Sequence, residues 1–158
     1  MQKITPFLWF NGQVEEAVNF YTAIFKNSKV GNISRYGDGA PLPAGTIMSA
    51  MFTLENQEFF LLNGGPQFTF TPAISFFINC KDQVEVDYYW EKLTADGGQP
   101  GQCGWLTDKF GLSWQVIPSA LNELLRDKDS ATSARVMQAM LAMNKIDIAT
   151  LEKARDQK

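Results

Sequence analysis

The sequence of 158 residues contains no histidine. Histidine is the side chain that enzymes use most often as a general base near neutral pH, and it is the commonest protein ligand of transition metals. Its absence excludes a Ser-His-Asp triad, a Cys-His pair and any zinc or iron site built on imidazole. Carboxylates, lysines, tyrosines, thiols and bound water are the groups that remain for chemistry.

Cysteine is scarce as well. Cys80 and Cys103 are too few for a disulfide scaffold, and their spacing is not that of a metal site. Two free, reduced thiols are the expected state. Nothing near Cys103 in the sequence would lower the pKa of its thiol, so an inert cysteine is favoured over a reactive one in a binding pocket.

Long apolar runs and an excess of basic charge are also missing. Stretches such as FFLL and SFFI fall far short of the roughly 20 apolar residues that span a bilayer. The first residues, MQKITPFLWF, lack the apolar core and the small-residue cleavage site of a signal peptide. The net charge is −3, and no block of Lys and Arg stands out. These features predict a cytoplasmic protein that binds neither nucleic acid nor membrane.

Apolar residues are present in the proportion of a globular chain, with 45% hydrophobic and 20% charged residues. The first half predicts a strand over 4–10, a helix over 13–25 with apolar residues at helical spacing, and a strand over 28–36. After a loop rich in Gly and Pro, two further strands flank Asn56 as a hairpin.

The second half repeats this order. Residues 73–79 alternate as a strand, and Asp82 with Glu85 three positions later resembles the capping box of a helix that Gly97 and Gly98 close. Two more strands follow, QCGWL and LSWQVIP, on either side of the turn DKFG. Strands grouped around separate helices predict an α+β fold, and the repeated order suggests an internal duplication.

The last forty or so residues differ, because ALNELLRD, SATSARVMQAMLAM and IDIATLEKAR are all helix-forming. Val136, Met140 and Met143 stand at helical spacing. A stripe of this kind packs against the domain or a second subunit more often than it binds a ligand.

Alternation along two strands separates a core face from a second face. The core face is predicted to carry Ile74, Phe76, Ile78, Trp114 and Val116, and Trp9 of the first strand is also assigned to core packing. Ser75, Phe77, Ser113 and Gln115 are predicted to share the other face. Asp108 is expected to close its turn through the side chain, not to act as a catalytic acid.

Four stretches resemble one known family: PFLWFNGQVEEAVNFYTAIF, PAISFFINC, CGWLTDKFGLSWQVIP and ARVMQAMLAMNKIDIATLEKA. They are similar to PhnB-like proteins of the vicinal-oxygen-chelate superfamily, which also includes glyoxalase I, bleomycin-resistance proteins and extradiol dioxygenases. The resemblance covers nearly the whole chain. CGWLTDKFGLSWQVIP is its most specific part.

The resemblance implies a single α+β domain of two βαβββ modules, whose curved mixed sheets surround a cleft, and a homodimer. The modules would occupy residues 1–66 and 67–118, and a helical extension would occupy 119–158. Metal-using relatives place ligands at positions that correspond to Pro6, Phe59 or Phe60, Ala73 and Gln115. Proline, phenylalanine and alanine side chains cannot coordinate an ion, so the expectation is no metal and no cofactor.

Three functions follow from the resemblance. The first is binding of a small organic molecule in a metal-free cleft. The alternatives are a metal-dependent lyase, isomerase or dioxygenase, and the methyltransferase named in the label that such sequences often carry, 3-demethylubiquinone-9 3-methyltransferase. The glycine-rich turn typical of S-adenosylmethionine enzymes is missing after the first strand. No catalytic residue is identified, and the predicted ligand-binding residues are Ser75, Phe77, Ser113, Gln115, Trp105, Cys103 and Arg35.

Arg35 precedes a loop, where it would hold an anionic group or end a strand in solvent. The polar residues of the second face would contact a ligand or hydrogen-bond one another in a vestigial cavity. The sequence leaves both pairs of alternatives open.

Overall fold

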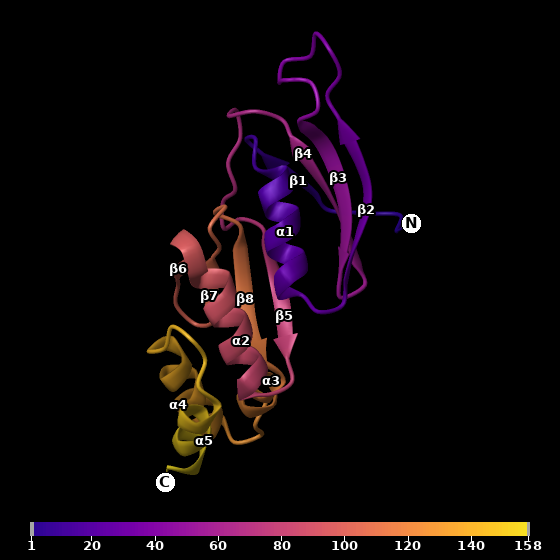
Figure 1. The fold of residues 1–158 in the computed structure, drawn as a ribbon. Helices are drawn as coiled ribbons and strands as arrows, with labels where there is room; N and C mark the ends of the chain where they lie inside the picture. Colours follow the sequence, from indigo (N-terminus) through magenta and orange to yellow (C-terminus); the bar gives the residue numbers. More distant parts are fainter. Residues whose placement is uncertain (1, 158) are drawn as a thin grey trace. The chain divides into compact units, whose positions relative to one another are not determined.

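The computed structural model describes residues 2–157, which form two compact units. One unit ends at Phe70 and the other begins at Thr71. Each unit has the order strand, helix and three strands, and the second continues into further helices (Figure 1). The predicted α+β fold with two βαβββ modules is therefore confirmed. No helix within residues 2–157 combines the length and the apolar composition needed to cross a membrane.

The N-terminal unit is one mixed sheet with a helix on one face. Its strand order is β1-β4-β3-β2, with β1 parallel to β4 and the other pairs antiparallel. Its elements are β1 (Phe7–Phe10), α1 (Val14–Ile24), β2 (Ser28–Arg35), β3 (Ile47–Leu54) and β4 (Gln57–Asn63). Glu55 and Asn56 have positive φ values of 46° and 68°, which is the conformation that a two-residue hairpin turn requires.

The two faces of this sheet differ in burial. The α1 side is formed by buried side chains such as Leu8, Phe10 and Leu61. Trp9 alternates with them and is half-buried on the opposite face, so its predicted place in the core is wrong. Its indole Nε1 donates to the carbonyl oxygen of Gly65 at 2.9 Å, and its ring packs edge-on against Phe68.

The C-terminal unit begins with a second mixed sheet, of strand order β5-β8-β7-β6. Its first elements are β5 (Ser75–Cys80), α2 (Gln83–Thr94), a 3-10 turn η1 (Ala95–Gly97), β6 (Gln99–Pro100), β7 (Trp105–Thr107) and β8 (Ser113–Pro118). Asp82 caps α2 by accepting a hydrogen bond from the Glu85 N–H at 2.9 Å, as predicted. Glu85 accepts in turn from the N–H of Lys81.

Ile74 departs from the predicted core. It lies one residue before β5, and 70% of its surface is exposed. The alternation that would have turned it toward the core begins only at Ser75, where pairing with β8 starts. Of the other residues predicted for the core face, Trp114 and Val116 are buried, and Phe76 and Ile78 are half-buried.

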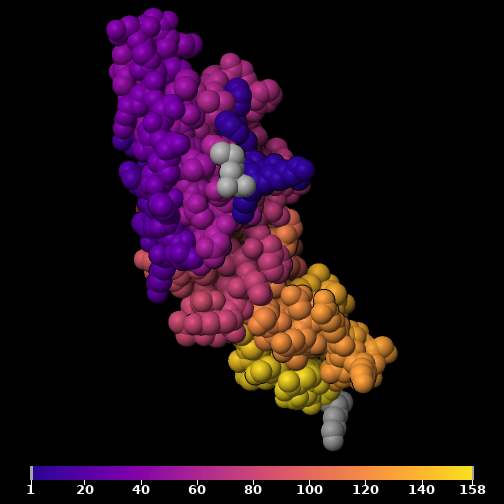
Figure 2. Space-filling model, turned by 90° about the vertical axis from the view of Figure 1, so that its right-hand side faces the viewer, coloured from indigo at the N-terminus to yellow at the C-terminus, as the bar shows by residue number. Residues whose placement is uncertain are grey.

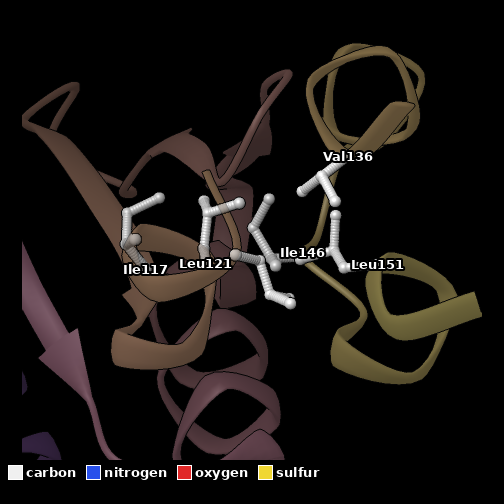
Figure 3. Close-up of a cluster of buried hydrophobic side chains, with 6 residues drawn as sticks. Ile117, Leu121, Val136, Ile146 and Leu151 are labelled. Atoms are coloured by element: carbon white, nitrogen blue, oxygen red, sulfur yellow. The ribbon is translucent and has the colours of Figure 1, made fainter. Parts of the chain in front are cut away.

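Three helices complete the unit and are called the C-terminal extension: α3 (Ser119–Leu125), α4 (Ser130–Leu141) and α5 (Ile148–Asp156). In Figure 2 their orange and yellow atoms gather into one compact body. Their buried side chains form a cluster with Ile117 at the end of β8, and Met140 and Met143 pack against it, as predicted for this stripe. Figure 3 shows Ile117, Leu121, Val136, Ile146 and Leu151 pointing toward one another.

Candidate functional site

A row of three side chains crosses the second sheet on one face. Phe77 of β5 pairs with Gln115 of β8, which pairs with Trp105 of β7. Paired residues of neighbouring strands point to the same side of a sheet. Gln115 and Trp105 are half-buried, and 53% of the surface of Phe77 is exposed. Two aromatic rings therefore flank one amide.

A second row lies two residues along the strands and is polar. It consists of Ser75, Ser113 and Thr107, again paired across β5, β8 and β7. The Nε2 amide of Gln115 donates to the Oγ of Ser75 at 2.9 Å and so joins the two rows. These six side chains are called the β8 site below.

Ser113 is the exceptional member of the β8 site. Its side chain is 1% exposed, and its Oγ has no hydrogen-bond partner in the described part of the chain. Leaving a buried hydroxyl unpaired costs about 1–3 kcal/mol. A ligand or water atom that bonded to Oγ would remove this cost.

The other face of β8 is fixed by Asp108. Its Oδ1 accepts from the backbone N–H groups of Phe110 and Leu112 at 2.9 and 3.1 Å, and its Oδ2 accepts from the indole Nε1 of Trp114 at 2.9 Å. The side chain is 3% exposed. The predicted turn-closing role is confirmed. Because Trp114 is anchored on this side, the residues that alternate with it, Ser113 and Gln115, are directed to the other side.

Cys103 precedes β7 and does not belong to either row. Its φ is +57°, and its N–H donates to the carbonyl oxygen of Met143 at 2.8 Å. The neighbouring Gly104 N–H donates to Asn144 in the same way. Cys103 therefore contacts the C-terminal extension.

Both cysteines are free thiols, as predicted. Cys80 is fully buried, and burial, together with the nearby carboxylates of Glu85 and Asp82, raises the pKa of its thiol to about 12. A thiol held protonated at neutral pH is a poor nucleophile. Cys80 is therefore a core residue.

Arg35 lies in the N-terminal unit at the end of β2. Its Nη1 donates to the carbonyl oxygen of Gly45 at 2.8 Å, which ties the end of the strand to the end of the loop that follows. Its exposed side chain is thus engaged in a structural contact at the base of this loop.

The positions that the family resemblance predicts as metal ligands hold side chains that do not fit a divalent ion. Phe60 stacks on Phe7 with ring centroids 5.6 Å apart, and neither ring offers a donor atom. At Gln115 one neutral carbonyl oxygen is available, and Pro6 and Ala73 provide none. Within residues 2–157, no three Asp, Glu or Cys side chains approach closely enough to bind a metal together.

Two further residues of this face were not predicted as site residues. Thr107 completes the polar row, and Ile117 follows Gln115 on the same side of β8. Thr107 could have been found from its alternation with Trp105. The position of Ile117 beside the extension depends on tertiary packing and leaves no signal in the local sequence.

Comparisons with known proteins support the superfamily. The family model of 3-demethylubiquinone-9 3-methyltransferase matches residues 2–117. The solved structure of a PhnB protein from Bacillus cereus, provisionally described as a 3-demethylubiquinone-9 3-methyltransferase, is 42% identical in sequence to this chain and has a TM-score of 0.69. The match covers 75% of this chain and 100% of the B. cereus chain. No curated protein sequence matches the chain.

Two more distant structures share the fold. Protein PA1353 from Pseudomonas aeruginosa is 23% identical with a TM-score of 0.61, over 75% of this chain and 98% of that one. FosX, a fosfomycin resistance protein from Listeria monocytogenes, is 18% identical with a TM-score of 0.56, over 80% and 98%. The chain therefore belongs to the PhnB-like 3-demethylubiquinone-9 3-methyltransferase family and has the fold of the vicinal-oxygen-chelate superfamily.

Proposed function

We propose that this protein binds a small, neutral organic molecule at the β8 site without a metal ion. The ligand would have a flat apolar body and a polar head. Ser75, Phe77, Ser113, Gln115 and Trp105 would form the contacts. The sequence also suggested Cys103 and Arg35. Cys103 is left out because it lies outside both rows and its backbone N–H bonds to Met143, and Arg35 is left out because its guanidinium bonds to the carbonyl oxygen of Gly45.

The observation that carries the proposal is the unpartnered hydroxyl of Ser113. The side chain is 1% exposed, and its Oγ has no hydrogen-bond partner among residues 2–157. Native structures rarely leave a buried polar atom in this state, so a ligand group or an ordered water is expected there. Functional sites are one setting in which such atoms persist.

The chemistry of the head group follows from the polar atoms. Ser113 Oγ can donate to a ligand carbonyl oxygen. Gln115 uses its amide nitrogen on Ser75, while its carbonyl oxygen accepts no bond within the described chain and can accept from a ligand N–H or O–H. No charged side chain belongs to either row, so a neutral head is favoured over an ion.

The body of the ligand would contact the aromatic pair. Trp105 and Phe77 stand on either side of Gln115 in one row. A flat apolar group placed over Gln115 would therefore contact both rings. Pockets that combine aromatic walls with a few polar groups are typical of small-molecule sites.

Two other functions remain as outcomes of the test. FosX from L. monocytogenes has been solved with Mn(II), but at 18% identity this relationship shows the fold alone. The family name implies methyl transfer, although the first strand here is not followed by the glycine-rich turn common in enzymes that use S-adenosylmethionine. The side chains of the β8 site supply neither a metal-ligand set nor an obvious catalytic base.

The test compares three probes of equal size that differ in charge: benzamide, benzoate and benzylamine. Benzamide is expected to raise the thermal midpoint most, because only it presents a neutral carbonyl and N–H to Ser113 and Gln115. A ligand at a hundred times its Kd adds about 2.7 kcal/mol of stability. Ser113→Ala should weaken benzamide binding several-fold, and the exposed-strand variant Ser34→Ala should not.

Three results would contradict the proposal. Equal shifts of the thermal midpoint with all three probes, or no shift with any of them, would contradict the proposed preference for a neutral head group. Stoichiometric Fe, Zn, Ni or Mn in the purified protein would favour the metal-dependent enzyme. A thermal shift with S-adenosylmethionine, but with no small aromatic compound, would favour the methyltransferase.

We further propose that the protein acts as a cytoplasmic homodimer, since proteins of this superfamily commonly pair. Light scattering coupled to size-exclusion chromatography would give the mass directly. A mass near the 17.7 kDa of one chain would contradict the dimer.

A further inference from the structure

The C-terminal extension closes one end of the β8 site, and we propose that it sets the length of the ligand that the site accepts. This inference rests on the proposed function, because it concerns the same rows of side chains. It assigns a role in specificity to Ile117 and Ile146, and a role in positioning Trp105 to the segment that joins α4 to α5.

The direction of the Ile117 side chain follows from its position in β8. Side chains alternate along a strand, so Ser113, Gln115 and Ile117 lie on one side of β8, and Trp114 and Val116 lie on the other. Ile117 is 6% exposed and packs in the cluster of the extension, which contains neither Trp114 nor Val116. The extension is thus in contact with the Gln115 side of the strand at its C-terminal end (Figure 3).

A second isoleucine, Ile146, packs in the same cluster as Ile117 at this end of the β8 site. Ile146, which lies between α4 and α5, is fully buried in the same cluster. A Cβ atom added to Gly104 would approach Ile117 Cδ1 to 2.6 Å and Ile146 Cγ1 to 3.2 Å, so the two isoleucines pack over the start of β7 as well. A side chain larger than that of glycine therefore has no room at residue 104.

The extension also bonds to the backbone that precedes Trp105. Cys103 and Gly104, the two residues before it, both have positive φ, which is unfavourable for a cysteine. Their N–H groups donate to the carbonyl oxygens of Met143 and Asn144, both at 2.8 Å. The extension therefore fixes the backbone that leads into Trp105, the aromatic partner of Gln115.

The extension is itself tied down from a second element. The side chain of Gln83 in α2 donates to the carbonyl oxygen of Ile146 at 3.0 Å and accepts from the N–H of Ile148 at 2.9 Å. Lys145 forms an ion pair with Asp87 of α2 at 2.6 Å. Residues 143–148 therefore bond to the backbone before β7 on one side and to α2 on the other. This segment is called the wall below.

The family supports an added role for these residues. The family model ends at residue 117, before α3, so it does not extend to the tail sequence ARVMQAMLAMNKIDIATLEKA, for which a resemblance was predicted. The whole of the B. cereus protein is matched by 75% of this chain. The two rows of the β8 site and Ile117 lie within the residues that the family model matches, and residues 143–148 lie beyond them. Ile117 is two residues beyond Gln115, a distance of about 7 Å along the strand. A ligand whose head bonds at Ser113 and Gln115 can extend only that far toward the C-terminal end of β8.

The experiment measures the Kd values of N-alkylbenzamides, from methyl to hexyl, for the full chain and its variants. Affinity for the parent protein is expected to peak at a short chain and then fall. Ile146→Ala should move the optimum by two or three methylene groups, each worth about fourfold in Kd. Val136→Ala is the matched control, since Val136 is fully buried in the same cluster but lies on α4. It should keep the parental optimum.

The outcomes separate the two proposals. If the parent protein binds benzamides and Ile146→Ala keeps the parental optimum, the wall is refuted and the binding function stands. If the parent protein binds none of them, the proposed function fails and the wall fails with it. Ile146→Val, a milder change, should give a smaller shift in the same direction and serves if the alanine variant does not fold.

Discussion

The indole Nε1 of Trp114 donates a hydrogen bond to Oδ2 of Asp108 at 2.9 Å, six residues earlier in the chain. Both side chains are buried, and the other carboxylate oxygen of Asp108 accepts two backbone N–H groups of the turn. One carboxylate therefore closes the turn and sets the direction of the first residues of β8, on which Ser113 and Gln115 depend.

Asp108→Ala should lower the free energy of unfolding by about 3 kcal/mol, because it leaves buried donors without an acceptor. Chemical denaturation would measure the loss. Asp38→Ala, a change of the same kind in the exposed loop after β2, should have little effect. Equal losses in the two variants would contradict the role given to Asp108.

Gly64→Ala should destabilise the N-terminal unit by about 1–3 kcal/mol, the usual range for overpacking. A Cβ atom at this position would collide with Cζ2 of Trp9, whose ring is held by its bond to Gly65. Gly37→Ala is the control, since a Cβ atom there meets nothing within 4 Å. Thermal unfolding followed by circular dichroism would measure the change in stability. An unchanged midpoint for Gly64→Ala would show that this contact is not tight.

Cys80 should resist thiol reagents at pH 8 in the native protein, whereas the half-buried Cys103 should react. Labelling with a chromogenic disulfide should give about one thiol per chain, and two after unfolding in urea. The folded pKa of Cys80, about 12, lies above the ordinary value of 9.0. The stabilisation linked to this thiol is therefore complete below pH 9 and is lost as the pH rises from 9 toward 12.

The Cys80→Ala variant supplies the control for that pH dependence. Its stability should fall less steeply than that of the parent protein above pH 9. Two thiols labelled at the same rate in the native state would argue against the burial of Cys80.

Gln115→Glu should not create a metal site, although the family resemblance predicts a carboxylate ligand at this position in metal-using relatives. The other corresponding positions hold Pro6, Phe59 or Phe60, and Ala73, none of which can coordinate an ion. Elemental analysis after dialysis against Mn(II) or Zn(II) should show no stoichiometric metal in either protein. Retention of one ion per chain by the variant alone would reveal ligands outside these positions.

Much of the fold follows from the sequence, because local signals agree with one another. The helical stripe from Val14 to Tyr21, the turn at Asn56 and the cap at Asp82 each predict an element that the structure contains. The alternation of Ser113, Trp114 and Gln115 likewise assigns the two faces of β8. The errors occur at Trp9 and Ile74, where the period-two pattern was extended to residues whose burial depends on contacts elsewhere.

The sequence by itself determined which side chains are available for chemistry. Because the chain has no histidine, no imidazole can serve as a base or a metal ligand in any fold that it adopts. Tertiary structure alone decided what lies beside Gln115. Strand pairing brought Phe77 and Trp105 to its two sides, and packing of the extension brought Ile146 to Ile117. These neighbours are far apart in the chain, so only long-range pairing and burial could select them.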